Sequence, residues 1–317
     1  MIVSSIDETN REEEISMKNK LSKDIKRNWT LYILVLPVIA FYIIFCYKPM
    51  YGAIIAFKDF SPKLGIMGSP WVGSEHFRTF FASSDFFRIL RNTVEISLAS
   101  IVFGFPAPII LALLINELQH KWFAKSVQTI TYLPHFISLV VVCGMLRNFV
   151  SDKGIVTQLL AMFGTEPTNL LNNADYFLPI YVISGIWQEI GWGSIIYLAA
   201  LTGVDQELYE AAGIDGAGRL RQTWAITIPS ILPTIVTMLI LRLGSVMNVG
   251  FEKIILLYNP MTYEKADVIS SYVYRVGMVN RDYGFSTAVG LFNSVINFAF
   301  VIGANFISKK LNSTSLW

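Results

Sequence analysis

The chain has 317 residues, of which 53% are hydrophobic and 15% are charged, and its mean hydropathy is +0.50. An ordinary soluble domain carries about 25% charged residues, so this composition excludes a typical soluble enzyme and indicates a membrane protein. The 25 Lys and Arg residues nearly balance the 23 Asp and Glu residues, which leaves no basic field for nucleic acid. The aromatic content of 14%, together with the apolar content, excludes a disordered chain.

The N-terminal segment, residues 1–28, is polar and carries a basic cluster directly before the first apolar stretch. That stretch covers about residues 29–47, which is long enough to cross a bilayer core about 30 Å thick. It ends in Cys46-Tyr47-Lys48-Pro49 rather than at the small residues of a cleavage site, so we expect a retained membrane anchor. The positive-inside rule then places the N-terminus in the cytoplasm. The cluster consists of Lys18, Lys20, Lys23, Lys26 and Arg27.

Five further apolar stretches follow, and because backbone groups in lipid must be hydrogen-bonded internally, each predicts a helix. The sequence therefore predicts an all-α membrane protein with about six transmembrane helices in a membrane domain over residues 29–307. Six crossings return the tail, residues 308–317, to the cytoplasm. Cys46 and Cys143 both fall in apolar stretches, so we expect small buried hydrophobes rather than a disulfide. The further stretches are about 93–115, 127–146, 177–201, 231–249 and 287–307.

Two long segments are expected on the outer side, at about residues 48–92 and 250–286. In the first, four phenylalanines recur at near-helical spacing, which indicates an amphipathic helix. A helix lying in the membrane interface and a loop helix packed on the bundle explain this pattern equally well. The residues are Phe77, Phe80, Phe81 and Phe87.

The segment at about residues 203–230 is too polar to enter lipid, so it is expected to be a cytoplasmic loop. Asp205 is placed to cap a short helix over about 206–212. Three glycines then favour breaking that helix, and a second short helix is expected from about Leu220. The glycines are Gly213, Gly216 and Gly218.

Pro229 would lead from this loop into the next apolar stretch. Two short helices joined by a glycine turn would form a compact knob. Within the knob, Ala211 and Ala212 leave a smooth patch against which another protein could pack.

The same loop resembles the membrane-subunit signature of binding-protein-dependent ABC importers. The similarity lies in Glu210-Ala211-Ala212, Gly216, Ile226 and Ile228-Pro229, with matching spacing over 20 residues. Ile228 stands where the family usually has Leu. Further segments are similar to the carbohydrate permeases of this class, especially those associated with oligosaccharides and polysaccharides. They are FGFPAPIILALLINEL, TYLPHFISLVVV, GWGSIIYLAAL and the C-terminal SLW.

The resemblance implies a type I ABC importer-like permease fold in the cell membrane and a coupling role for the loop. In that family the loop docks into a cleft on a separate ATPase, where Glu210 would pair with a basic group and the alanines would pack at the contact. The expected coupling residues are Glu210, Ala211, Ala212, Gly213, Asp215, Gly216, Ile226 and Pro229.

The implied assembly has several other chains. A second, different permease chain would supply the other half of the pore, and two copies of a cytoplasmic ATPase would bind ATP and Mg. An extracytoplasmic sugar-binding protein would deliver the cargo. This chain contains no G-x-x-x-x-G-K-[ST] phosphate loop, so no cofactor is expected on it and ATP hydrolysis is expected elsewhere.

A sugar needs hydrogen-bonding groups and aromatic faces, and polar groups at membrane depth usually face the bundle interior or a wet cavity. The fourth stretch offers several such groups, the fifth carries three, and in the sixth two asparagines at i and i+4 share one helix face. By resemblance, substrate binds between these late helices. The candidate pathway residues are Trp187, Gln188, Glu189, Trp192, Arg242, Ser245, Asn248, Asn293 and Asn297.

Structural roles stay open for these residues. The asparagines could bond neighbouring helices, the tryptophans could belong to the interfacial belt, and Glu189 and Arg242 could pair with other groups. His135, beside Pro134, is expected to be a local structural feature, and three scattered histidines form no metal constellation.

Other functions also stay open at this stage. One is a secondary transporter coupled to ions through Glu189 and Arg242, and another is a membrane scaffold or sensor. An ABC importer for a solute other than a sugar also fits.

Overall fold

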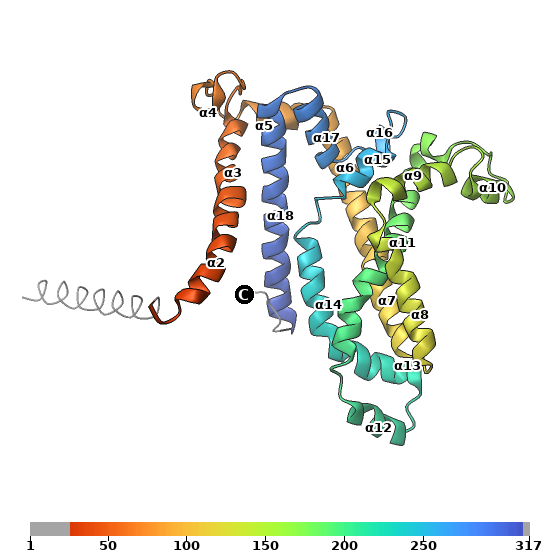
Figure 1. The fold of residues 1–317 in the computed structure, drawn as a ribbon. Helices are drawn as coiled ribbons and strands as arrows, with labels where there is room; N and C mark the ends of the chain where they lie inside the picture. Colours follow the sequence, from red (N-terminus) through yellow and green to blue (C-terminus); the bar gives the residue numbers. More distant parts are fainter. Residues whose placement is uncertain (1–25, 313–317) are drawn as a thin grey trace, which may run out of the picture.

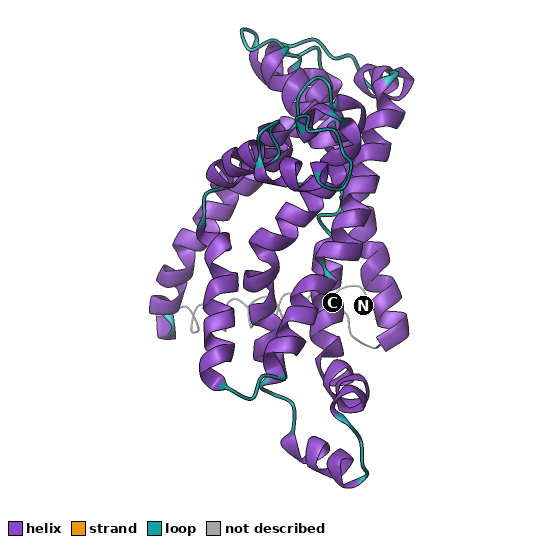
Figure 2. Ribbon diagram, turned by 90° about the vertical axis from the view of Figure 1, so that its right-hand side faces the viewer, coloured by secondary structure: helices purple, strands orange, loops and turns teal. Residues whose placement is uncertain are grey.

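The computed structural model describes residues 26–312, and the elements in that range are helical apart from one isolated β-bridge between Lys58 and Trp71. Figure 2 shows these helices and the loops that connect them. The predicted basic positions Lys18, Lys20 and Lys23 and the terminal SLW lie outside the described residues.

The first helical span covers Trp29–Phe57 and stands apart from the other helices along most of its length (Figure 1). It is longer than the predicted 29–47, and its most apolar window is not buried within the chain. Cys46 is therefore exposed, and only Cys143 is buried as predicted. The span consists of α2 (Trp29–Phe41), the π-helical η1 (Tyr42–Tyr47), α3 (Lys48–Met50) and the 3-10 helix η2 (Tyr51–Phe57).

The second span begins earlier than predicted, because α6 (Asp85–Ala99) and α7 (Pro106–Asn116) join through a π-helical turn, η3 (Ser100–Gly104), into one helix. Ahead of it, α4 (Gly65–Gly68) and α5 (Glu75–Ala82) lie at the end of the molecule away from the start of α2 (Figure 1).

The phenylalanines before this span belong in part to α5, a helix that packs on the bundle. Phe80 of α5 is fully buried, and its ring centroid lies 5.4 Å from that of Phe292 in the last helix. Phe87 falls on α6 instead and is exposed. Of the two interpretations of this segment, the structure supports the packed loop helix.

The prediction of one helix over 127–146 is wrong. The chain forms α8 (Lys121–Tyr132), a 3-10 turn η4 (Leu133–Phe136) and α9 (Leu139–Phe149), and the two parts meet at an angle of 97°. Pro134 lacks a backbone N–H and disfavours helix in the residue before it, and Ile137 has extended backbone angles. α10 (Ile155–Ala161) and the short 3-10 helix η5 (Leu170–Asn172) follow.

The fourth predicted helix is α11 (Ala174–Leu201), which packs against α7, α8 and α14 (Ile228–Leu243). Its 28 residues would span about 42 Å at 1.5 Å per residue. Two glycines bring neighbours close: a Cβ added at Gly191 would lie 2.1 Å from the Thr131 carbonyl oxygen of α8, and one at Gly193 would lie 3.0 Å from Pro108 of α7.

Four described helices are long and apolar enough to cross a membrane, or five if the bent α8–α9 pair counts as one span. The sequence predicted six. The predicted span that is missing from this count is α11. It is long enough to cross a membrane but not apolar enough, because it carries Gln188 and Glu189 between two tryptophans. Because α7, α8 and α14 pack against part of α11, that part of its surface does not need to be apolar.

The prediction of a separate second short helix in the polar loop, from about Leu220, is also wrong. α13 (Arg219–Gln222), the π-helical η6 (Thr223–Thr227) and α14 form one helix over Arg219–Leu243. The π turn directly precedes Pro229, whose missing N–H would otherwise break the α-helical pattern. The last helix, α18 (Tyr283–Asn312), ends at the same end of the molecule as α12 (Gln206–Ile214) and the start of α2 (Figure 1).

Four short helices form the opposite end of the bundle: α15 (Phe251–Leu257), α16 (Tyr263–Ala266), α17 (Ile269–Tyr274) and the π-helical η7 (Arg275–Val279). They are held to α6 by Asp267, which is fully buried. Its carboxylate accepts hydrogen bonds from Arg275 at 2.6 and 3.0 Å and from Ser271 at 2.8 Å, and it pairs with Arg88 of α6 at 3.4 Å. This ion pair raises the pKa of Arg275.

We expect Asp267→Ala to lower the free energy of unfolding by about 3 kcal/mol, because it leaves two arginines without their shared partner. Glu95→Ala is the control, since it removes an exposed partner of Arg91 at 2.7 Å and should cost less than about 1 kcal/mol. Unfolding by SDS in mixed micelles measures both. Equal losses would contradict the role given to Asp267.

Candidate functional site

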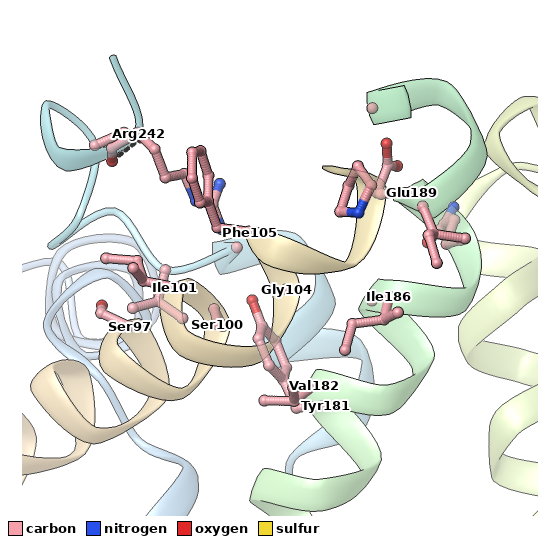
Figure 3. Close-up of a pocket in the computed structure, with 18 of the residues that line it drawn as sticks. Ser97, Ser100, Ile101, Gly104, Phe105, Tyr181, Val182, Ile186, Glu189 and Arg242 are labelled. Carbon is pink, nitrogen blue, oxygen red and sulfur yellow. Dashed lines mark hydrogen bonds between the residues drawn. The ribbon is translucent and has the colours of Figure 1, made fainter. Parts of the chain in front are cut away.

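A cavity of about 650 Å³ opens between the α6–α7 helix, α11 and the chain from Met238 to Lys253 (Figure 3). Its wall mixes apolar side chains with a few polar and charged ones. The predicted pathway residues that line it are Gln188, Glu189, Arg242, Ser245 and Asn248.

Ser245 and Asn248 reach the cavity from outside a helix, which corrects their predicted place on the fifth helix. α14 ends at Leu243, and the chain from 244 to 250 is not helical. A Cβ at Gly244 would lie 2.9 Å from Val301, so α14 and α18 approach closely where the helix ends. The irregular backbone therefore lies beside the cavity, where polar groups can be satisfied.

The predicted residues Trp187, Trp192, Asn293 and Asn297 do not line this cavity. The two asparagines bond across to the irregular segment instead. Their Nδ2 atoms donate to Asn248 Oδ1 at 2.8 and 3.3 Å, and Asn297 Oδ1 accepts from the Met247 N–H at 3.0 Å. These contacts favour the alternative in which the asparagines hold neighbouring segments together.

His135 links the α8–α9 bend to α11. Its Nδ1 lies 2.9 Å from Glu189 Oε2, and its ring stacks on Trp192 with centroids 4.4 Å apart. Glu189 is thus paired with His135, whereas Arg242 forms no ion pair with any residue of the described range. Glu189 and Arg242, the two residues named in the ion-coupled hypothesis, form no ion pair with each other in the described range.

Lys253 is a cavity residue that the sequence reasoning missed, because it lies in the segment expected to be outside. It is 7% exposed, and its Nζ donates to the Tyr181 carbonyl at 2.9 Å and lies 4.8 Å from the Tyr181 ring centroid. Burial lowers the pKa of Lys253 to about 8, although Cys143 and Glu189 oppose this shift. The available signal was a lysine directly before the apolar run at residues 254–257.

The polar loop begins as predicted. Asp205 Oδ1 accepts a hydrogen bond from the Glu207 N–H at 3.0 Å, which caps α12. The helix passes through Gly213, contrary to expectation, and ends after Ile214.

Gly216 ends α12. Its φ is +74°, its N–H bonds to the Gly213 carbonyl at 3.0 Å, and the Ala217 N–H bonds to the Ala212 carbonyl at 2.9 Å. This is the Schellman arrangement, in which the left-handed position strongly favours glycine.

The signature residues divide into two groups. Glu210, Ala211, Gly213, Asp215 and Gly216 are exposed, and next to them Ile214 is 88% exposed. Ile226 is half-buried and packs with Tyr209 against the cluster formed by α7, α11 and α14, while the Tyr209 hydroxyl lies 2.9 Å from Thr227 Oγ1. One part of the loop is therefore anchored, and α12 presents an uncovered surface at the end of the molecule.

Comparison with known proteins identifies the family of the chain. Residues 104–313 match the family described as the binding-protein-dependent transport system inner membrane component. The chain is 46% identical to Protein LplB of Bacillus subtilis (strain 168), over 92% of each chain. It is 43% identical to the polygalacturonan/rhamnogalacturonan transport system permease protein YteP of the same organism, over 95% of this chain and 94% of the other.

Solved structures are similar over most of the chain. A bacterial ABC transporter involved in the import of the acidic polysaccharide alginate aligns with a TM-score of 0.86 and 47% identity, over 92% of this chain and 99% of that one. The alginate transporter in complex with an alginate pentasaccharide-bound periplasmic protein also aligns with a TM-score of 0.86.

The chain therefore belongs to the family of binding-protein-dependent inner membrane transport components. It is a multi-pass membrane permease subunit of an ABC importer, it works with a binding protein and other importer components, and it is not an enzyme. ATP hydrolysis belongs to a separate chain.

Gly216→Ala should raise the hydrogen-exchange rates of the α12 amides about 5- to 30-fold, because a Cβ in the left-handed region costs about 1–2 kcal/mol. Gly213→Ala is the matched control, since Gly213 is helical and an added Cβ there meets nothing within 4 Å; it should slow exchange. If both variants exchange alike, the cap assigned to Gly216 is wrong.

Proposed function

We propose that this chain forms half of the translocation pathway of an ATP-driven oligosaccharide importer in the cell membrane. The observation that carries this is the combination of a cavity with polar and charged groups in its wall and an uncovered helix, α12, at one end of the molecule. α11 connects the two, because it lines the cavity and then leads through Asp205 directly into α12.

The coupling surface of this proposal is α12. Glu210 would pair with a basic group of the ATPase, and Ala211 and Ala212 would let the two surfaces approach closely. Ile226 and Pro229 would support the loop from the bundle. Movement of α12 would pass to α11 through the cluster that contains Tyr209 and Ile226.

The assembly would contain a second, different permease chain and two copies of the ATPase, which would bind ATP and Mg. Six crossings are proposed, with α11 as a span enclosed by protein, and both termini would lie in the cytoplasm beside α12. The ends of α2 and α18 on the α12 side support this topology. A binding protein would dock at the opposite, outer end, and the lining residues Gln188, Ser245 and Asn248 would contact the cargo.

A saccharide cargo is supported by the relatives. YteP carries polygalacturonan or rhamnogalacturonan by its name, and the similar solved structure imports alginate. An arabinooligosaccharide permease, AraP of Bacillus subtilis (strain 168), is 25% identical.

Glu210→Lys is expected to abolish oligosaccharide uptake, because it places like charges at the ATPase contact while leaving the exposed helix intact. Uptake and ATP hydrolysis would be measured in vesicles that contain the complete importer, and stimulation of hydrolysis by loaded binding protein should also be lost.

Glu117→Lys is the control, since it makes the same charge change at an exposed residue, the C-cap of α7, which lies outside α12 and outside the end at which the binding protein would dock. It should leave ATPase stimulation unchanged. Normal uptake by Glu210→Lys would contradict the coupling proposal.

A further inference from the structure

We propose that Lys253 and Arg242 select a carboxylated oligosaccharide, one built from uronic-acid-type units, over a neutral one. This inference rests on the proposed function and specifies its cargo. Both side chains line the same cavity, one from α15 and one from the last turn of α14.

Lys253 is a buried cation with unused hydrogen-bonding capacity. An ammonium has three N–H donors, and within the described chain Nζ has one acceptor, the Tyr181 carbonyl at 2.9 Å. It forms no ion pair with a carboxylate in that range. A buried charge without a counter-ion is costly, so the site favours an anion that enters the cavity.

The backbone leaves room for this cation. A Cβ added at Gly185 of α11 would lie 3.3 Å from Nζ, and one at Gly250 would lie 2.7 Å from the Tyr181 hydroxyl. Both glycines line the cavity. A side chain at Gly185 would therefore crowd the Lys253 ammonium, and one at Gly250 would collide with the Tyr181 hydroxyl.

Arg242 adds a second cation to the wall, and Figure 3 shows it across the cavity from Glu189. A guanidinium can bind a carboxylate through two parallel hydrogen bonds. It has no carboxylate partner in residues 26–312.

Glu189 is the one acidic residue of the lining, and it already pairs with His135 at 2.9 Å. The lining therefore holds two cations against a single, engaged carboxylate. A neutral sugar would leave the buried Lys253 ammonium without a counter-ion, whereas each uronate unit supplies a carboxylate to Lys253 and to the exposed Arg242. The cavity volume of about 650 Å³ leaves room for more than one sugar unit.

The test is uptake by the complete importer, with its binding protein, in vesicles. The probes are trigalacturonate and trimannuronate, each also as its methyl ester, with maltotriose as a neutral sugar and glucose 6-phosphate as another anion. Because the binding protein is the same for every permease variant, differences between variants report on the permease. Wild type should import an acidic trisaccharide in preference to its ester.

Lys253→Met and Arg242→Gln should each raise the half-saturating concentration of the acidic trisaccharide about tenfold or more, the loss expected for one hydrogen bond to a charged group. Uptake of the ester should change less than about twofold. Arg147→Gln is the matched control, because Arg147 is exposed on α9 and does not line the cavity.

Several outcomes would overturn the inference: equal uptake of acid and ester, preference for maltotriose or glucose 6-phosphate, or variants that lose acid and ester uptake alike. Uptake of maltotriose without the acids would overturn this inference and leave the proposed oligosaccharide importer standing. Uptake of no saccharide at all would instead overturn the proposed function.

Discussion

The close packing of α7 and α8 against α11 is the contact on which the other features depend. At Gly191 the Thr131 carbonyl leaves no room for a side chain, and at Gly193 Pro108 is almost as close. This contact brings the turn that carries His135 beside Glu189, while other residues of α11 face the cavity. A polar helix can cross lipid only when other helices cover it, and these two contacts provide part of that cover.

α11 also connects the cavity to α12, the proposed coupling surface. α11 ends at Leu201, and the chain reaches α12 within a few residues, where Asp205 caps the helix. Ile226 and Tyr209 hold the loop against α7, α11 and α14, while Glu210 and Ala211 remain exposed. In the proposed importer, a displacement of α12 would pass through this anchored cluster to the helices that line the cavity. ATP and cargo would then favour different states of one assembly.

The sequence predicts the helical class, the cap at Asp205 and the permease family, because these follow from hydropathy and from local spacing. It does not predict the bend between α8 and α9, since Pro134 within a long apolar run fits a kinked helix as well as a broken one. Lys253 was missed for another reason. Hydropathy placed it after the fifth stretch, and only the tertiary fold returns α15 to the cavity. Likewise, the bonds of Asn293 and Asn297 to Asn248 depend on where α14 ends, which the apolar pattern does not reveal.

The central claim is that this chain works as one half of a membrane pore coupled to a separate ATPase. Gentle affinity purification of the chain from its native membranes, with every co-purifying protein identified by mass, tests it most directly. The account predicts recovery of a second permease together with an ABC ATPase. Recovery of the chain alone, under conditions that keep a known importer intact, would contradict it.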